Sequence, residues 1–256
     1  MKNKKVFGTK EWAKYSANST IGCSNDCKYC YARASYIKKG NDSETWTDEN
    51  RINFEWNKKD GVIMFPTNHD ITTTNYDDAL KVLNKLLSTG NDVLIVSKPK
   101  FEVIERLLKD LKDYKDKILF RFTIGSSDNK VLKFWEPNAS LFEERLDCLK
   151  LAFNEGFATS VSMEPYLDLN TSDVVKTANK FLSYSTNSVW IGKMNGIDTR
   201  IADIDENIIN DYNEAMKDEN IWKIYNSLKS EPKIRWKESI KKVIGLELAT
   251  ETGLDI

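Results

Sequence analysis

Three of the four cysteines stand close together, at Cys23, Cys27 and Cys30, in the spacing C-x3-C-x2-C. Three thiols this close cannot all pair with one another, and the spacing is too tight for a network of disulfides. The pattern suits a loop that wraps a metal centre, because clustered thiolates hold iron–sulfur clusters. A cubane cluster needs four ligands, so three thiolates leave one iron open to bind a small molecule and pass it an electron.

A structural zinc site is the alternative for these cysteines. Structural zinc prefers four closed ligands, and no fourth ligand with finger-like spacing follows Cys30. His69, the only histidine, lies well outside that spacing. Cys148 lies far from the other three in an amphipathic segment, where we expect a small buried hydrophobe on a helix.

The motif has the aromatic Tyr29 before its last cysteine and Tyr31-Ala32 after it, and it resembles the cluster motif of the radical S-adenosylmethionine (SAM) superfamily. The resemblance implies that the three cysteines hold a [4Fe–4S] cluster and that SAM chelates the fourth iron. Electron transfer into SAM then gives methionine and a 5′-deoxyadenosyl radical, which abstracts hydrogen from a substrate. It also implies an electron donor such as flavodoxin or ferredoxin, and it places Tyr29 beside the adenine of SAM.

Composition indicates a globular protein of the cytoplasm. Of 256 residues, 40% are hydrophobic and 30% charged, and the net charge is −1, which lacks the basic excess usual in nucleic-acid binders. No apolar run is long enough to span a bilayer, and no apolar segment of a signal peptide follows the basic first residues. Clustered cysteines favour a reducing compartment. We expect one domain over 1–256, with a core at about 16–200 and a C-terminal extension at about 201–256.

Short apolar runs alternate with segments of helical periodicity along the chain. The predicted strands are continuous apolar runs, as in parallel strands that are covered on both faces; they lie at 16–21, 61–65, 92–97, 118–124, 158–163 and 188–192, with a seventh compatible run at 233–236. Helices are predicted at 32–39, 76–88, 101–111, 140–155, 171–183, 206–217, 220–230 and from 238. Such βα repeats give an open sheet or a barrel. The resemblance implies an α/β fold with a partial (β/α)6 barrel of parallel strands, followed by a C-terminal helical extension.

The working face of a βα barrel lies at the C-terminal ends of its strands. After the second predicted strand stand Thr67, Asn68, His69 and Asp70, where radical SAM proteins often carry a Gly-Gly-Glu-like motif that binds the SAM amino group. This chain departs from that motif. Thr67 and Asn68 are predicted to contact SAM in its place, with Asp70 as a further acceptor. His69 and Asp70 are also candidates for facing the substrate.

Later strand ends supply further candidates. Lys98 is predicted to neutralise the SAM carboxylate, and Glu164 to contact SAM, while Lys193 and Asn195 are candidate substrate contacts. The segments Ser162–Asp168 and Trp190–Gly196 also resemble pieces of a phage- and bacterium-associated radical-SAM-like family of unknown activity. For Lys98, an exposed lysine before a turn proline is an equally good interpretation.

The segment from Trp135 to Leu146 resembles part of a radical SAM subgroup related to spore photoproduct lyase. That resemblance makes Ser126 and Arg145 SAM contacts. The alternative is a turn around Ser126 and a surface ion pair between Glu136 and Arg145, which would contribute little.

Two functions remain open. The first is a radical SAM enzyme with an unidentified substrate, and the candidate substrates include a nucleic-acid or nucleoside component. The second is a cluster-binding regulatory or redox-sensing protein on a degenerate barrel without SAM turnover. A basic group near Trp236 is either a nucleic-acid patch or a solvated helix face, and we favour the latter; it comprises Lys229, Lys233, Arg235, Lys237, Lys241 and Lys242.

Overall fold

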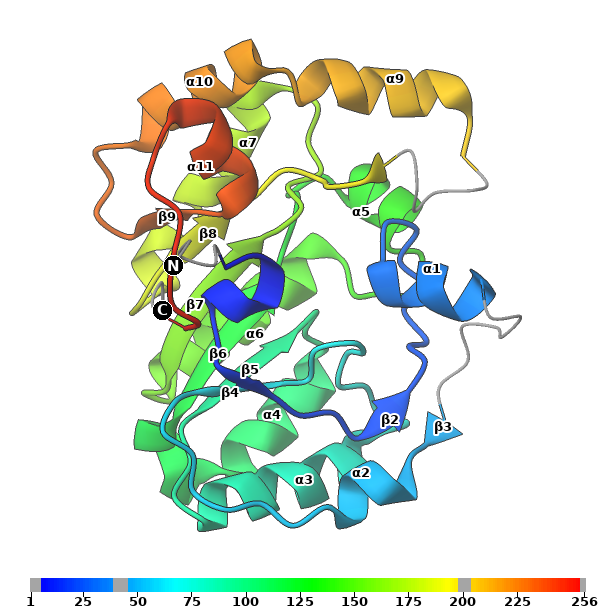
Figure 1. The fold of residues 1–256 in the computed structure, drawn as a ribbon, viewed down its shortest axis with the longest axis vertical. Coiled ribbons are helices and arrows are strands. Elements are labelled where there is room, and N and C mark those ends of the chain that lie inside the picture. Colours follow the sequence, from blue (N-terminus) through cyan, green and yellow to red (C-terminus); the bar gives the residue numbers. More distant parts are fainter. Residues whose placement is uncertain (1–5, 39–45, 198–203, 254–256) are drawn as a thin grey trace.

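The computed structural model describes residues 6–38, 46–197 and 204–253. In these residues seven parallel strands form one sheet in the order β1-β4-β5-β6-β7-β8-β9 (Figure 1). Their bounds are β1 Tyr15–Ser16, β4 Ile63–Phe65, β5 Val93–Ser97, β6 Ile118–Thr123, β7 Ala158–Met163, β8 Val189–Ile191 and β9 Ile234–Trp236. The predicted parallel α/β architecture is confirmed. β1 and β9 are the two edges of the sheet, so it is an open, partial barrel.

Helices follow the strands as the periodicity predicts. They are α1 Tyr31–Lys38, α3 Tyr76–Ser88, α4 Phe101–Asp110, α6 Phe142–Asn154, α7 Thr171–Asn179, α9 Glu206–Ala215, α10 Asp218–Leu228 and α11 Glu238–Ile244. Two short helices were missed, α2 Glu49–Asn53 and α5 Asn129–Trp135, and each begins after an aspartate whose side chain accepts a backbone N–H bond, Asp48 and Asp128. The described residues also contain three 3₁₀ turns: η1 Gly8–Glu11, η2 Lys112–Lys117 and η3 Leu182–Tyr184.

The first predicted strand, 16–21, is divided in the structure. β1 joins the main sheet, whereas β2 (Thr20–Ile21) pairs with β3 (Trp46–Thr47) in a separate antiparallel ribbon. Asn18 lies between them, and its side-chain oxygen accepts the backbone N–H groups of Thr67 and Asn68 at 2.8 and 3.1 Å. These bonds to the loop after β4 occur where the chain turns away from the sheet.

The strands alternate between two faces. One face packs with the helices in the main core, through residues such as Phe65, Ile95, Phe120 and Val161. The other carries Met64, Leu94 and Trp190 in a smaller cluster with Trp12 from the N-terminal segment. In β6 and β7 this inner face is buried yet polar, with Arg121, Thr123, Ser160 and Ser162. A polar inner face beneath strand ends is where a barrel enzyme holds its ligands.

The two ends of the described chain lie side by side (Figure 1). The Val6 N–H donates to the Ala249 carbonyl at 2.9 Å, and the Gly253 N–H donates to the Lys10 carbonyl at 2.8 Å. The C-terminal segment therefore adds the edge strand β9 and helix α11 to the barrel wall, beside η1. No helix in the described ranges is long and apolar enough to cross a membrane.

Candidate active site

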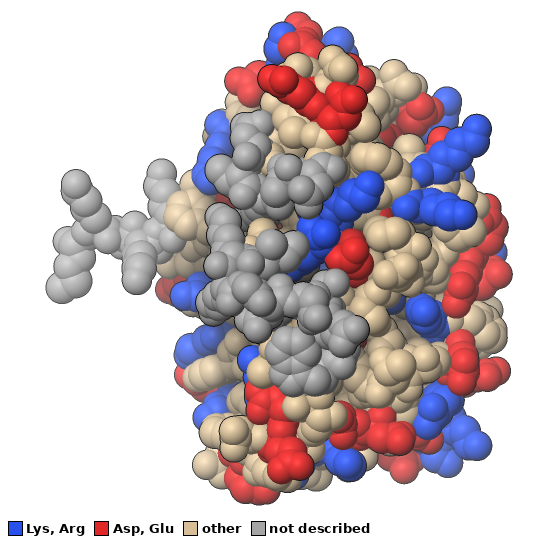
Figure 2. Space-filling model, turned by 90° about the vertical axis from the view of Figure 1, so that its right-hand side faces the viewer, with Lys and Arg blue, Asp and Glu red and all other residues tan. Residues whose placement is uncertain are grey.

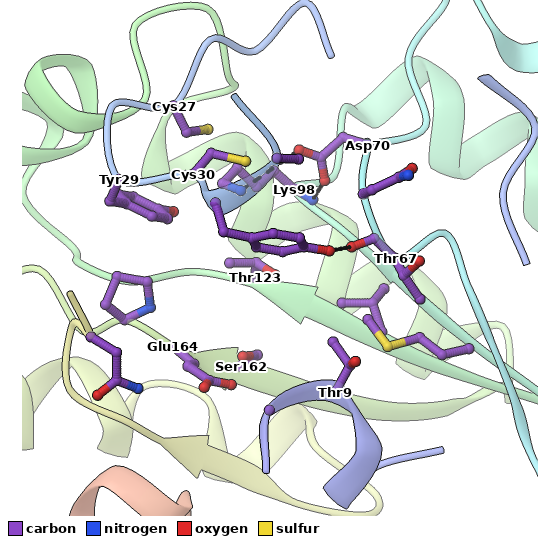
Figure 3. A pocket seen from close by; sticks show the side chains of 18 of the residues that line it. Thr9, Cys27, Tyr29, Cys30, Thr67, Asp70, Lys98, Thr123, Ser162 and Glu164 are labelled. Atoms are coloured by element: carbon purple, nitrogen blue, oxygen red, sulfur yellow. Dashed lines mark hydrogen bonds and ion pairs between the residues drawn. The ribbon is translucent and has the colours of Figure 1, made fainter. Parts of the chain in front are cut away.

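A cavity of about 670 Å³ opens at the C-terminal ends of the strands. The cysteine loop forms one end of it, and η1 with α11 forms the other (Figure 3). In Figure 3, Cys27, Cys30 and Tyr29 lie across the cavity from Thr9 of η1, and Ser162 and Glu164 of the β7 segment lie between them.

The cysteine loop is a tight turn whose backbone folds the thiols toward the cavity. Gly22 and Asp26 adopt left-handed conformations, with φ of 80° and 46°. The Cys30 N–H donates to the Cys27 carbonyl at 3.0 Å. All three cysteines are free and line the cavity. Arg33 of α1 fixes the turn through an ion pair with Asp26 at 2.6 Å.

The end of α5 and the segment that follows it hold the loop from behind. The Lys28 N–H donates to the Trp135 carbonyl at 2.9 Å, and the Asn138 side chain donates to the Ser24 carbonyl at 2.9 Å. The Tyr29 hydroxyl donates to the carboxylate of Glu136. The family-like segment at 135–138 therefore anchors the loop that carries the cysteines.

Glu136 and Arg145 form a buried ion pair, not the surface pair of the alternative interpretation. Their side chains are both 0% exposed, and a guanidinium nitrogen of Arg145 lies 2.5 Å from a Glu136 oxygen. Arg145 also donates to the carbonyls of Ser140 at 2.7 Å and Thr123 at 3.2 Å. Arg145 lies outside the cavity lining, so the structure gives it a role behind the loop.

Ser126, the other residue predicted from that resemblance, is also outside the lining. It is fully buried, and its hydroxyl donates to Asp168 and accepts the Asp128 N–H at 2.9 Å. The remaining predicted site residues do line the cavity; they are Cys23, Cys27, Tyr29, Cys30, Thr67, Asn68, His69, Asp70, Lys98, Glu164, Lys193 and Asn195.

Asp70 is the polar centre of the cysteine end. It accepts the Lys98 N–H at 2.7 Å, the Asn25 side-chain N–H at 2.9 Å and the Ser97 hydroxyl at 3.1 Å, and it lies 3.6 Å from the Lys98 ammonium. Burial raises the pKa of Asp70, but Lys98 and these donors outweigh it, so the pKa lies below its ordinary value. Asp70 thus ties the ends of β4 and β5 to the cysteine loop as a carboxylate.

The thiols themselves are desolvated. Burial raises the pKa of Cys23 to about 12, with Asp70 adding to the shift, and burial also raises the pKa of Cys27, against the opposing charge of Lys98. Thiols bind metal as thiolates, so metal binding here releases protons. Lys98 is the cation placed to favour that ionisation.

His69 is held in a structural position although its ring reaches the cavity. Its Nε2 accepts the backbone N–H of Ser19 at 3.1 Å, and burial lowers the pKa of the imidazole to about 4. The ring is therefore neutral. Thr67 is positioned from both sides, because its hydroxyl accepts from Asn18 at 2.8 Å and its carbonyl accepts from the Tyr31 hydroxyl at 2.6 Å.

The far end of the cavity rests on a buried charge cluster that the sequence interpretation did not identify. The Lys237 ammonium lies 2.5 Å from Glu11, 3.4 Å from Glu164 and 3.9 Å from Glu238, and it donates to the Gly8 carbonyl at 2.8 Å. Lys237 is fully buried, so its assignment to a solvated basic face was wrong. In the sequence, Lys237 stands directly after the compatible run at 233–236, and a position at a strand end indicates a side chain that can face the cavity.

Arg121 lies beneath the cavity on the inner face of β6. Its guanidinium stacks 4.7 Å from the Trp12 ring and 5.3 Å from the Trp190 ring. Its Nε donates to Ser160 at 3.0 Å, while Nη1 and Nη2 have no hydrogen-bond partner in the part of the chain that the structure describes. Burial lowers the pKa of Arg121 to about 9. An arginine inside the apolar run at 118–123 was the sequence signal for it.

Comparison with known proteins shows the family to which the chain belongs. The model of the radical SAM superfamily matches residues 17–181, well over half of the chain. Curated relatives include the uncharacterized protein ORF301 of Acidianus two-tailed virus, 25% identical over 173 residues (61% of this chain and 57% of that protein). Another is the uncharacterized protein MJ0683 of Methanocaldococcus jannaschii, 25% identical over 162 residues (60% and 61%). The chain thus matches roughly three fifths of the length of these relatives.

Solved structures share the fold. Spore photoproduct lyase complexed with dinucleoside spore photoproduct matches with a TM-score of 0.59 at 13% identity, over 92% of this chain and 79% of that one. SuiB of Streptococcus suis bound to S-adenosylmethionine matches with a TM-score of 0.55 at 11% identity, over 94% and 54%. At these identities the likeness concerns the fold alone. On the extent of the family match, with its cysteine motif on the cavity wall, this chain belongs to the radical SAM superfamily.

Proposed function

We propose that the protein is a radical SAM enzyme in which Cys23, Cys27 and Cys30 hold a [4Fe–4S] cluster. One observation carries this proposal: three free thiols from one loop meet the end of a cavity at the C-terminal edge of a parallel sheet. In the described residues, no three His, Cys, Asp or Glu side chains are grouped to hold a single metal ion, as the zinc alternative would require.

The chemistry that a bound cluster and SAM supply is one-electron cleavage of the sulfonium to methionine and a 5′-deoxyadenosyl radical, which takes hydrogen from the substrate. The chain's own part is to bind and orient. Lys98 offers an ammonium to the SAM carboxylate, and Tyr29 offers an aromatic wall beside it. Thr67, Asn68 and Glu164 offer polar groups along the same lining. All four cysteines are free, which suits a reducing compartment such as the cytoplasm.

For the substrate, the charges of the lining favour an anion. Each acid there has a cation beside it: Asp26 pairs with Arg33, Asp70 with Lys98, and both Glu164 and Glu238 with Lys237. Among the described residues, the lining lysines without an ion pair are Lys10, Lys193 and Lys242.

These three lysines belong to the half of the cavity away from the cysteines, which η1, the loop after β8 and α11 build. SAM carries a net positive charge, so it does not account for them. Beside them the Phe7 ring is 47% exposed, and the Lys242 ammonium lies 4.6 Å from its centre. A phosphate beside a planar base would use both features. We therefore propose a nucleotide-bearing substrate, a nucleic-acid or nucleoside component.

One observation favours the second function, a cluster protein without SAM turnover. At the position of the usual Gly-Gly-Glu-like motif, the carboxylate of Asp70 is already engaged by Lys98, Asn25 and Ser97. Anaerobic reconstitution with iron and sulfide, then SAM and dithionite, separates the two. We expect 5′-deoxyadenosine and methionine in equal amounts. A brown, reducible protein that forms neither product would support the second function, and a colourless zinc-loaded protein would exclude both.

The substrate proposal is tested by fluorescence anisotropy with a labelled single-stranded hexadeoxynucleotide. Removing two lysines, in Lys10→Ala/Lys242→Ala, should reduce the slope of log K for binding against log salt concentration by about 0.7 per lysine, the value for a single strand. The matched control is Lys109→Ala/Lys112→Ala, at the end of α4 and just after it, which should bind as the wild type does. Equal binding by both variants would refute the nucleotide proposal and leave the SAM-cleavage assay unaffected.

A further inference from the structure

The outer side of the cysteine loop, opposite the cavity, carries a second functional feature. The cavity side is taken by the proposed SAM and substrate sites, so an electron has to enter from behind the loop. What lies behind it is the end of α5, where the Lys28 N–H donates to the Trp135 carbonyl at 2.9 Å. This hydrogen bond connects a surface helix to the residue that follows Cys27.

That outer side is basic. Lys28, Lys130 and Lys133 have no ion pair among the residues that the structure describes. Lys130 and Lys133 are exposed on α5, and the Lys28 ammonium lies 3.8 Å from the centre of the Phe134 ring. These three lysines, with Phe134 and the exposed Asn138, are called the loop–α5 surface. Figure 2 looks onto the side of the molecule on which α1 and α5 lie, where Lys and Arg side chains extend across the middle toward the upper right, with Asp and Glu side chains above and among them.

The acids that border the loop–α5 surface are engaged elsewhere. Asp26 is paired with Arg33 at 2.6 Å, Asp128 caps α5 through the Lys130 N–H at 2.7 Å, and Glu143 accepts from Asn129 at 2.8 Å. Glu136 is buried against Arg145. Asp128 and Glu143 keep their charge in these contacts with uncharged donors, so the three lysines exceed them by one positive charge, on a chain whose net charge is −1. Such a local excess steers partners of opposite charge.

We propose that the loop–α5 surface is the docking site of an acidic one-electron carrier protein of the flavodoxin or ferredoxin kind. This inference rests on the proposed function, because it names the partner of the same site. The carrier is oxidised by one electron, and that electron is consumed in breaking the carbon–sulfur bond of SAM, with no proton transferred. Transient redox partners bury little area and depend on charge, and a small basic surface around one aromatic ring suits that kind of contact.

The test compares two reductants on the reconstituted protein. Dithionite is a small molecule that needs no docking surface, whereas a reduced acidic flavodoxin does. The variant Lys130→Glu/Lys133→Glu reverses two charges on α5 and leaves Lys28, which lies between two cysteines, unchanged. The matched control, Lys109→Glu/Lys112→Glu, reverses two exposed lysines at the opposite end of the βα units, at the end of α4 and just after it.

With subsaturating flavodoxin at low salt, Lys130→Glu/Lys133→Glu should form 5′-deoxyadenosine about tenfold more slowly than the wild type, by loss of electrostatic steering. The difference should shrink in high salt, and with dithionite both variants should match the wild type. Equal flavodoxin-driven rates for the two variants would overturn the proposal.

A direct binding measurement separates this proposal from the enzymatic one. Oxidised flavodoxin is titrated onto the reconstituted chain without SAM, and the weaker affinity should be confined to Lys130→Glu/Lys133→Glu. This result stands even if dithionite yields no SAM cleavage, in which case the proposed function fails on its own. If the variant instead loses affinity for the labelled hexadeoxynucleotide and keeps that for flavodoxin, the surface belongs to nucleic acid and the docking proposal is wrong.

Discussion

The buried pair of Glu136 and Arg145 offers a sharp test of how the cysteine loop is held. Arg145→Leu removes the only ion-pair partner of Glu136 among the described residues, and it leaves a carboxylate in a site that is 0% exposed. Breaking one side of a buried ion pair costs about 3–5 kcal/mol. Glu136→Leu should cost a similar amount, because it strands the guanidinium and the Tyr29 hydroxyl together.

Removing both partners should be much milder than the sum of the single changes. Glu136→Leu/Arg145→Leu leaves no buried charge, and apolar replacement of a buried pair is often close to neutral. The carbonyls of Ser140 and Thr123 and the Tyr29 hydroxyl still lose partners, so we expect a residual loss of about 1–3 kcal/mol. The coupling energy should therefore reach at least ~3 kcal/mol.

The free energy of unfolding is measured for the wild type, the two single variants and the double variant. Each reduced protein is unfolded in urea and followed by the fluorescence of its seven tryptophans. SAM affinity of the reconstituted variants is measured beside it. The interpretation of Arg145 as a SAM contact makes the opposite prediction: unchanged stability with weakened SAM binding. If Arg145→Leu unfolds at the same urea concentration as the wild type, the anchoring role derived from the structure is refuted.

Three further predictions concern other parts of the site. Alanine at any one of the three loop cysteines should abolish the brown colour after reconstitution, whereas Cys148→Ala should retain it; loss of colour in Cys148→Ala would contradict the ligand assignment. Burial and the neighbouring Glu238 raise the pKa of Glu11 from 4.5 to about 8, so the folded state holds a proton that the unfolded state releases, and the free energy of unfolding should fall as the pH rises between those values. Glu11→Gln should flatten that part of the stability curve in urea titrations, and an unaltered curve would show that Glu11 ionises normally. Gly125→Ala should destabilise the chain by roughly 1–3 kcal/mol in thermal unfolding, because the added Cβ would meet the Pro165 carbonyl at 2.6 Å, whereas Gly156→Ala, with nothing within 4 Å but a φ of 79°, should show only the smaller strain of its backbone.

Local pattern was enough to predict the elements that pack on both faces. The strands at 93–97, 118–123 and 158–163 are continuous buried runs, and the sequence marks them as such. The sequence pattern did not show that the predicted strand at 16–21 divides in two. The chain turns away from the sheet at Asn18, whose side-chain oxygen accepts backbone N–H groups from a loop about fifty residues away. α5 was missed because seven residues carry too little periodicity, although Asp128 marks its start.

The site was predictable where one short segment supplies it and hidden where distant segments meet. Three cysteines within eight residues can be recognised in the sequence as a candidate site, and so can polar residues that follow predicted strands. The pair of Glu11 and Lys237 joins the two ends of the chain, and only the closure of β9 onto β8 brings Lys237 under the cavity. The resemblance predicted Arg145 as a SAM contact, whereas the structure places it outside the cavity lining, in a buried ion pair with Glu136.

The residues that line the cavity fall into two groups, one inside and one outside the segment that the family model matches. These two groups coincide with the two ends of the cavity proposed for SAM and for the substrate. Residues 17–181 contain the cysteine loop, Asp70, Lys98 and Glu164, the groups proposed to serve the cluster and SAM. Lys10, Lys193 and Lys242 lie outside that segment, as does Phe7. The shared part of the chain thus builds the cofactor end, and the two termini, joined through Lys237, build the end proposed for the substrate. A partial barrel leaves its two edge strands, here β1 and β9, unpaired with each other. The substrate proposal therefore rests on residues outside the segment that the family model matches rather than on residues around the cysteines.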